Sequence, residues 1–267
     1  MIKNFFPFQP ELVSGRIINR YKRFLADIEL ADGRQVLAHV PNSGRMSTCW
    51  EPCAQVILTR HPENTGRKLL YTLQAVEMPD GWVGVNTLNP NRAVFNALLA
   101  GAIKELAGYR FIQSEVQNFT GSRFDLCLFD AVSSESLKHL ALNEKKATAL
   151  PGSFMAVPKL RQPAIIEIKN ATLRCRDGVT FPDAVTARGL KHTRHLIDLR
   201  NNGFRAILLF FAGRSNTHWV GPADNVDPDY GRALRQAMQC GVEVLALKVS
   251  VSPAGLTLHG MLPVICD

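Results

Sequence analysis

The sequence lacks the features that mark a zinc-binding, disulfide-rich or membrane-spanning protein. Its six cysteines include no C-x-x-C pair, and although Cys49 and Cys53 could supply half of a zinc site, no second ligand pair follows at a typical distance. No apolar run is long enough to span a bilayer, and the first ten residues lack a basic start followed by an apolar stretch. We therefore expect a cytoplasmic protein with free cysteines and no membrane partner.

The chain does have enough apolar residues for a sizeable core and a surplus of positive charge. Of its 267 residues, 46% are hydrophobic and only 20% are charged, which argues against disorder and allows one large domain or two ordinary ones. The formal net charge is +8. Such a surplus favours a polyanionic partner such as nucleic acid, although many basic proteins bind none.

The first 82 residues are typical of a small barrel of short strands. Apolar positions alternate within short segments, and turn signals such as Asp32-Gly33 separate them. We predict strands at 13–21, 24–30, 36–40, 55–59, 69–76 and 82–85. Five or six short strands without a helix-length segment fit an OB-type barrel, and an SH3-like barrel fits the pattern about as well.

The pattern changes after Asn89, where helices begin to alternate with strands. We predict helices at 92–106, 183–202 and 230–239, and strands at 110–119, 124–129, 164–170, 205–212 and 242–251. This alternation indicates a layered α/β domain, so we expect residues 1–82 and 88–267 to form separate cores. Residues 131–163, with a short helix near 137–147, are interpreted as a solvated insertion in preference to a basic flap over a nucleic-acid channel.

Three residues form the most informative chemical pattern. Asp125 lies on one predicted strand, and Glu167 and Lys169 lie on another, where the period of two places both on one face. If the strands are adjacent, the carboxylates meet and can bind Mg²⁺, which prefers oxygen ligands and keeps several waters. The lysine can then stabilise a phosphorane or orient a water. Because Glu-x-Lys is common by chance, an exposed strand face remains the alternative.

A series of blocks resembles the sugar fermentation stimulation protein A family. The blocks are 20–27 (RYKRFLAD), 39–46 (HVPNSGRM), 83–87 (VGVNT), 122–125 (SRFD), 167–170 (EIKN) and 181–186 (FPDAVT). The resemblance implies an N-terminal OB-fold at 1–82, a nuclease-like PD-(D/E)XK domain with a mixed sheet flanked by helices at 83–267, and double-stranded DNA as partner. One departure is Ala187, where the related motif has a glutamate.

The resemblance also implies roles for individual residues. It implies catalytic roles for Asp125, Glu167 and Lys169, and Mg²⁺ or Mn²⁺ ligation by Asp125 and Glu167, with Glu105 or Glu115 as a candidate further ligand. We expect the nucleic-acid contacts to come from Arg20, Lys22, Arg23, His39, Asn42, Ser43, Arg45, Arg123, Arg188, Lys191 and His192.

For two sets of candidate residues, a purely structural role is the alternative to nucleic-acid binding. Arg188, His192 and His195 fall on one stripe of a predicted helix, which serves either to hold phosphates or as a solvated helix face. The loop around Gly44 suits phosphate contact or is simply a tight turn.

Three functions remain open from the sequence. The first is a Mg²⁺-dependent nuclease, which the intact Asp, Glu and Lys favour. The second is a DNA-binding regulator that keeps the nuclease fold with little or no turnover, which Ala187 favours. The third is an RNA-binding protein, because OB barrels bind either polymer.

Overall fold

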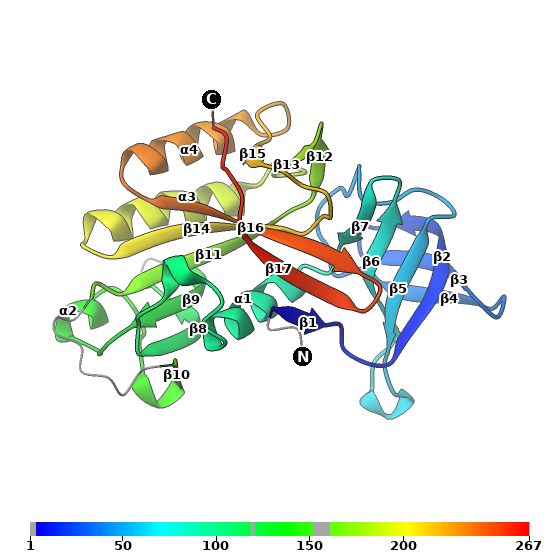
Figure 1. Cartoon of the computed structure of the whole chain (residues 1–267), viewed down its shortest axis with the longest axis horizontal. Helices are drawn as coiled ribbons and strands as arrows, with labels where there is room; N and C mark the ends of the chain where they lie inside the picture. Colours follow the sequence, from blue (N-terminus) through cyan, green and yellow to red (C-terminus); the bar gives the residue numbers. More distant parts are fainter. Residues whose placement is uncertain (1–3, 119–120, 152–160, 267) are drawn as a thin grey trace.

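The protein divides into a barrel and a larger layered domain, which lie at the right and left of Figure 1. The structure is a computed structural model and describes residues 4–118, 121–151 and 161–266. The end of the strand predicted at 110–119 and residues 152–160 of the predicted insertion lie outside the described residues.

The barrel consists of six strands in the order β4-β3-β2-β5-β6-β7. Strands that are neighbours in this order pair antiparallel. β4 also pairs in parallel with β6, which closes the barrel. Inward-facing apolar side chains such as Ile17, Ile28 and Leu58 are fully buried, as the alternating pattern predicts. The strands are β2 (Leu12–Tyr21), β3 (Leu25–Leu30), β4 (Gln35–His39), β5 (Gln55–Arg60), β6 (Tyr71–Met78) and β7 (Gly81–Gly84), with the 3-10 turn η1 (Glu63–Thr65) between β5 and β6.

The larger domain is built on an eight-stranded mixed sheet. Its central strands β11, β14 and β16 are parallel, and the outer pairs are antiparallel. In spatial order the strands are β1 (Phe5–Pro7), β17 (Gly255–Met261), β16 (Glu243–Ser252), β14 (Arg205–Ala212), β11 (Ala164–Ala171), β9 (Arg123–Phe129), β8 (Phe111–Gln117) and β10 (Thr148–Ala149). The central strand β14 is buried on both faces, which explains its continuous apolar run.

Helices cover both faces of this sheet (Figure 1). One apolar cluster lies between the sheet and α1 (Asn89–Leu99), and a second lies between the sheet and the paired helices α3 (Ala187–Asn201) and α4 (Pro228–Gln239). The side chains of Thr186 and Asp227 cap α3 and α4 by accepting bonds from backbone N–H groups. The remaining elements are short: α2 (Ser134–Leu137), η2 (Lys104–Leu106), η3 (Glu144–Lys146), β12 (Leu173–Cys175), β13 (Gly178–Phe181) and β15 (Val220–Pro222).

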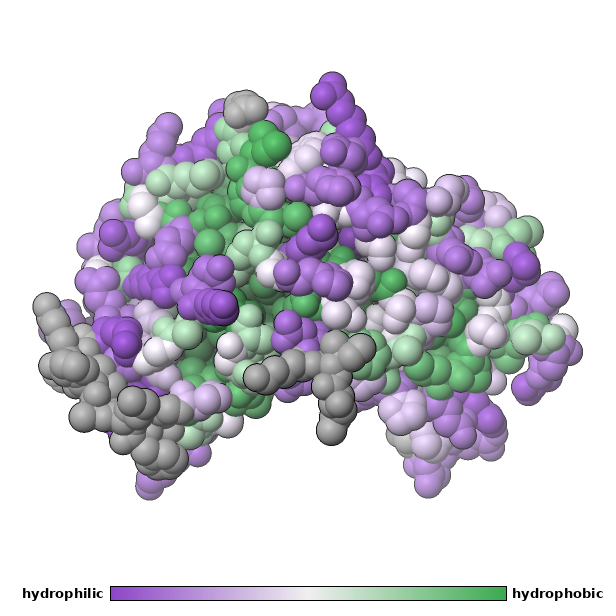
Figure 2. Space-filling view, in the orientation of Figure 1, coloured by the Kyte–Doolittle hydropathy of each residue, from purple (hydrophilic) through white to green (hydrophobic). Residues whose placement is uncertain are grey.

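The surface in the view of Figure 2 is largely polar. Apolar residues show mainly over the middle of the larger domain and over the lower part of the barrel. Among the described residues, no helix has both the length and the apolar character needed to cross a membrane.

The prediction of separate cores is wrong. The N-terminal strand β1 pairs with β17 of the large sheet, and Phe8 also packs in the cluster beneath α1. Ile57 and Ala75 of the barrel belong to the same cluster. The sequence pattern gives only the spacing of apolar residues, so it does not reveal which face of the barrel packs against the neighbouring domain.

Two further predictions need correction. The helix predicted at 92–106 ends at Leu99, because Gly101 has a positive φ of 64° and the chain continues into the separate turn η2. The described part of 131–163 is not a solvated insertion: β10 pairs with β8, and Leu140 and Leu142 are buried in the core. The helix predicted at 137–147 is replaced by α2 and η3.

Candidate active site between the barrel and the larger domain

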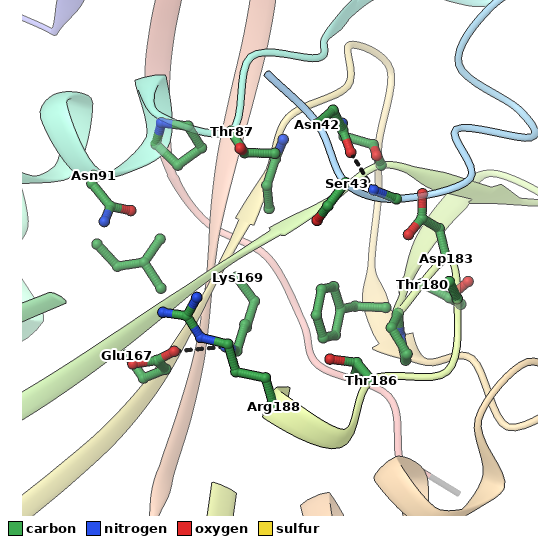
Figure 3. Close-up of a pocket in the computed structure, with 18 of the residues that line it drawn as sticks. Asn42, Ser43, Thr87, Asn91, Glu167, Lys169, Thr180, Asp183, Thr186 and Arg188 are labelled. Atoms are coloured by element: carbon green, nitrogen blue, oxygen red, sulfur yellow. Dashed lines mark hydrogen bonds and ion pairs between the residues drawn. The ribbon is translucent and has the colours of Figure 1, made fainter. Parts of the chain in front are cut away.

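A cleft of about 380 Å³ lies where the barrel meets the larger domain (Figure 3). Its walls come from the barrel loop at 42–44, the start of α1, strands β9 and β11, and the segment 180–188 that leads into α3. These parts are far apart in sequence, so the cleft exists only when the two domains are assembled.

The carboxylates of the cleft come from neighbouring strands. β9 and β11 are antiparallel with Ile166 opposite Leu126, and the next step in this register sets Glu167 beside Asp125. Both residues line the cleft together with Lys169. The prediction that adjacent strands bring Asp125 and Glu167 together is confirmed.

Asp125 is held by two donors at its carboxylate. The Asn91 side-chain amide on α1 donates to Oδ1 at 2.7 Å, and the backbone N–H of Ile168 donates to Oδ2 at 2.7 Å. Burial, followed by the neighbouring charge of Glu167, raises the pKa of Asp125 to about 6. Asp125 is therefore fixed in position, and its negative charge is incompletely compensated by the protein.

Glu167 uses its two oxygens unequally. Lys169 Nζ donates to Oε1 at 2.6 Å, and His192 Nδ1 on α3 lies 2.5 Å from the same oxygen. Because a carboxylate only accepts, His192 carries a proton on Nδ1. Burial alone would raise the pKa of Glu167, but Lys169 and His192 outweigh it, and the net effect is a lowered pKa. Glu167 Oε2 is buried and has no hydrogen-bond partner.

This arrangement fits a divalent cation held by oxygen ligands. An unpartnered buried carboxylate oxygen is unfavourable, and a cation at Glu167 Oε2 and Asp125 would satisfy it while relieving the repulsion between the two carboxylates. The described residues contain no group of three or more His, Cys, Asp or Glu side chains placed to hold a metal. Such an ion would therefore need water or backbone oxygen as its other ligands, which suits Mg²⁺.

Neither candidate for a third acidic ligand lies in the cleft. Glu105 is exposed on the 3-10 turn η2 and not on α1, and it is not among the residues that line the cleft. Glu115 lines a neighbouring hollow together with Asp125, but its carboxylate pairs with Arg123 at 2.7 Å. The helix residue that does reach Asp125 is Asn91, which was not among the candidate residues predicted from the sequence.

The barrel loop that faces the carboxylates is braced by residues predicted to contact nucleic acid. Arg20 donates to the backbone carbonyls of Asn42, Gly44 and Arg45 at 2.8–3.1 Å. The Asn42 side chain is buried and donates to the carbonyl of Val85. These two residues shape the loop from within, so their side chains are not placed to contact a polymer directly.

Other predicted contact residues are exposed around the cleft. Arg23, Ser43 and Arg188 line it, while Lys22 and Arg45 are exposed on the neighbouring barrel turn and loop. The remaining predicted residues differ: Lys191 is exposed outside the cleft, Arg123 is paired with Glu115, His39 is half-buried on β4, and His192 is only 5% exposed and bonded to Glu167.

The stripe predicted on α3 is therefore not simply a solvated face. His192 packs against Phe124 as well as bonding Glu167, and His195 Nδ1 lies 2.6 Å from the Ser122 hydroxyl. Among the three predicted stripe residues, only Arg188 is exposed. The two histidines connect α3 to β9 and β11 beneath the cleft.

Asp183 is a site residue that sequence reasoning did not single out. It lines the cleft, and its carboxylate Oδ2 accepts a bond from the backbone N–H of Met46 at 2.9 Å. Its position in the FPDAVT block was the only available signal. Through this bond the larger domain holds the end of the barrel loop directly.

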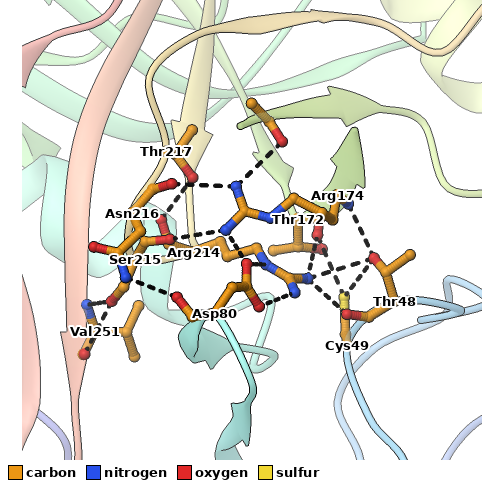
Figure 4. A network of polar contacts seen from close by, with 11 residues as sticks. Thr48, Cys49, Asp80, Thr172, Arg174, Arg214, Ser215, Asn216, Thr217 and Val251 are labelled. Atoms are coloured by element: carbon orange, nitrogen blue, oxygen red, sulfur yellow. Dashed lines mark hydrogen bonds and ion pairs between the residues drawn. The ribbon is translucent and has the colours of Figure 1, made fainter. Parts of the chain in front are cut away.

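A second polar region joins the domains behind the cleft (Figure 4). Arg214, which is 3% exposed, donates to the Asp80 carboxylate through both Nε and Nη2. Arg174 also bonds Asp80, and Arg214 reaches the carbonyls of Thr48 and Thr172. We call these five residues the Asp80 network. Asp80 lies in the turn between β6 and β7, so the network fixes the barrel against the larger domain.

Two family models together match most of the chain. Residues 18–85 match the SfsA N-terminal OB domain, and residues 88–255 match the sugar fermentation stimulation protein RE domain. The OB-type barrel and the mixed-sheet domain with helices predicted from sequence are thereby confirmed.

Named relatives cover nearly the same length. Sugar fermentation stimulation protein homologs of Syntrophotalea carbinolica and Geobacter sulfurreducens are 40% and 41% identical to this chain, over 96% and 95% of it and 97% and 96% of their own lengths. A solved structure of Pyrococcus furiosus SfsA in complex with Ca²⁺ covers 98% of this chain and 99% of its own, with a TM-score of 0.78 and 22% identity. That structure therefore supports the fold of the whole chain.

Proposed function

The chain belongs to the sugar fermentation stimulation protein family, and from its cleft we propose that it is a Mg²⁺-dependent phosphodiesterase that acts on DNA. The observation that carries this proposal is the incomplete satisfaction of two adjacent carboxylates. Glu167 Oε2 is buried without a partner beside Asp125, whose pKa is raised to about 6. A site with this donor set favours a hard cation.

Asp125 and Glu167 would hold the cation. When bound, it supplies a water of lowered pKa and neutralises charge that develops on the phosphate. The Pyrococcus furiosus relative was solved with Ca²⁺, which prefers the same oxygen ligands. Asn91 and His192 keep the two carboxylates in position through the bonds described above.

Lys169 provides the positive charge beside these carboxylates. Its ammonium group, held by Glu167 Oε1 at 2.6 Å, lines the cleft and can stabilise negative charge on a phosphate bound there. On the barrel side, Arg23 and Ser43 line the opposite wall and can bind the backbone of the polymer. The cleft thus combines a charged floor with a binding wall from the OB barrel.

A second candidate function is a DNA-binding protein without turnover. It is favoured by the small ligand set, since the described residues offer no cluster of three metal-binding side chains. Ala187, at the first position of α3, also replaces the acid of the motif that this segment resembles. In this case the cleft would bind DNA without cleaving it.

The test is cleavage of supercoiled, linear double-stranded and single-stranded DNA, and of RNA, with Mg²⁺, Mn²⁺ or EDTA. We expect metal-dependent cleavage of DNA that falls about a hundredfold in Lys169→Ala, because the lysine stabilises the transition state. Lys104→Ala, which removes an exposed lysine on η2 outside the cleft, is the matched control and should cleave normally.

The outcomes separate the two functions. Metal binding and DNA binding without cleavage would support the non-catalytic protein. Cleavage that persists in Lys169→Ala would assign the activity to a different site or to a contaminant. Preferential cleavage of RNA would change the proposed substrate, and a failure to bind any divalent cation would overturn the enzymatic proposal.

A further inference from the structure

The rim of the cleft carries unusually exposed apolar side chains. Among the described residues, the three most exposed large hydrophobic side chains are Val185 at 74%, Leu88 at 58% and Phe24 at 47%. Val185 lines the cleft, Leu88 directly follows the lining residue Thr87, and Phe24 directly follows the lining residue Arg23. We call these three side chains the apolar rim.

The apolar rim comes from three separate parts of the fold. Phe24 lies in the turn between β2 and β3, Leu88 precedes α1, and Val185 precedes α3. Single exposed apolar residues are ordinary on a protein surface, but the most exposed ones gathering from three elements around one cleft mark a binding surface.

Each rim residue has an exposed arginine close in sequence. Arg23 is adjacent to Phe24, and Arg188 follows Val185 by one helical turn. Arg92 lies one turn beyond Leu88 and lines a hollow of about 340 Å³ that shares Asn91 and Asp125 with the cleft. Each apolar side chain of the rim therefore has a positive charge close to it in sequence, and Lys169 adds a positive charge within the cleft. The ligand with matching chemistry offers flat apolar faces and anionic groups in alternation.

We infer that the apolar rim binds the bases of a nucleic-acid segment that is unpaired at the cleft, while the arginines and the floor bind its phosphates. This inference rests on the proposed function and specifies its substrate. In a duplex the base faces are stacked against each other, whereas an unpaired strand presents them to aromatic and apolar side chains. The substrate is then single-stranded DNA or a duplex opened by a gap or flap at the cleft.

The experiment measures binding in EDTA, so that it does not depend on cleavage. Fluorescence anisotropy compares single-stranded, fully paired and gapped DNA of equal length for the wild type and for Phe24→Ser/Leu88→Ser/Val185→Ser. We expect the triple variant to lose about tenfold in affinity for single-stranded and gapped DNA, because base contacts are removed. Affinity for the full duplex and the salt dependence of binding should stay unchanged, because no charge is altered.

A matched control carries Leu137→Ser and Met238→Ser, which are 43% and 39% exposed on α2 and α4 away from the cleft. It should bind all three DNAs like the wild type, and thermal unfolding checks that each variant is folded. Equal weakening on paired and unpaired DNA, or no weakening at all, overturns the inference and leaves the rim to a different class of partner. Wild-type protein that binds no nucleic acid would instead overturn the proposed function.

Discussion

The cleft and the Asp80 network lie side by side at the domain junction but differ in how completely their buried charges are paired. They share Thr172, which lines the cleft and whose carbonyl accepts a bond from Arg214. In the network, the buried guanidinium of Arg214 has a carboxylate and two carbonyls as partners. In the cleft, by contrast, Glu167 Oε2 has none, and burial raises the pKa of Asp125.

This difference separates a structural junction from a ligand site. Buried charges that are fully paired hold two surfaces in one arrangement, whereas buried charges left incomplete make the folded protein less stable until something binds them. The rigid network behind the cleft keeps its walls in place, so the ligand does not have to bring the domains together.

The largest effect is expected when the network loses its carboxylate. Asp80→Asn leaves Arg174 and Arg214 without their counter-charge and should lower the free energy of unfolding by about 2–4 kcal/mol, measured by urea denaturation. The control Asp32→Asn breaks an exposed pair with Arg34 and should lower it by less than about 1 kcal/mol. Equal losses in the two variants would show that the network does not stabilise the junction.

In the cleft, by contrast, removing a carboxylate charge is expected to raise the free energy of unfolding. Because the folded pKa of Asp125 is raised to about 6, the folded protein holds this proton more tightly than the unfolded chain, and stability is lost as pH rises from about 4 to 6. Without metal, Asp125→Asn should therefore be more stable than the wild type by about 1–3 kcal/mol at pH 8.

The gain in Asp125→Asn should become small near pH 4, where the wild-type carboxyl is protonated in the folded state and about half ionised in the unfolded chain. With Mn²⁺ at pH 8 the order should reverse, because only the wild type gains from metal binding. Thermal unfolding with EDTA or Mn²⁺ checks both. If the variant is less stable than the wild type in EDTA at pH 8, the ionised Asp125 carboxylate does not destabilise the metal-free protein as proposed.

A smaller effect is expected for the residue that orients Glu167. His192→Leu removes one of the two donors at Glu167 Oε1 and should weaken Mn²⁺ binding about tenfold, measured by electron paramagnetic resonance titration. His192→Asn keeps an N–H at the position of Nδ1 and should bind nearly like the wild type. If both variants lose the same affinity, His192 only fills space and does not position Glu167.

The smallest effect on ligand binding is expected at the barrel loop. Arg45→Ala should weaken DNA binding only a few-fold and reduce the salt slope by about one, since one phosphate contact is lost. Arg20→Ala should also lower stability, by about 1–3 kcal/mol, because three loop carbonyls lose their donor. Anisotropy across a salt series and urea denaturation distinguish the two. Identical behaviour of both variants would contradict the bracing role of Arg20.

Local patterns predicted much of the fold because they reflect local physics. The strand Arg205–Ala212 is recognisable by its nearly continuous apolar run. Helix α4 begins at Pro228, directly after its capping residue Asp227, and Gly241 follows its end with a positive φ. Strands β12, β13 and β15 have only three or four residues each, which is too short for a recognisable period, and they were missed.

The candidate site was predictable only where strand alternation decides the outcome. Glu167 and Lys169 share a face by period, and the family blocks pointed to Asp125. Asn91 and Asp183 were not predictable as contact residues, because their bonds to β9 and to the barrel loop join segments far apart in sequence. Whether Arg20 faces solvent or its own loop depends likewise on tertiary packing.

The pairing of β1 with β17 affects the order in which the barrel and the large sheet can fold while the chain is being synthesised. β1 precedes the barrel in the chain and pairs with β17, with Phe5 opposite Thr257, so this pair can form only after β17 has been synthesised. The barrel, whose strands all lie between Leu12 and Gly84, can close long before that. The barrel is thus inserted between β1 and α1 of the larger domain, and a ribosome stalled before β17 would carry a closed barrel beside an unfinished sheet.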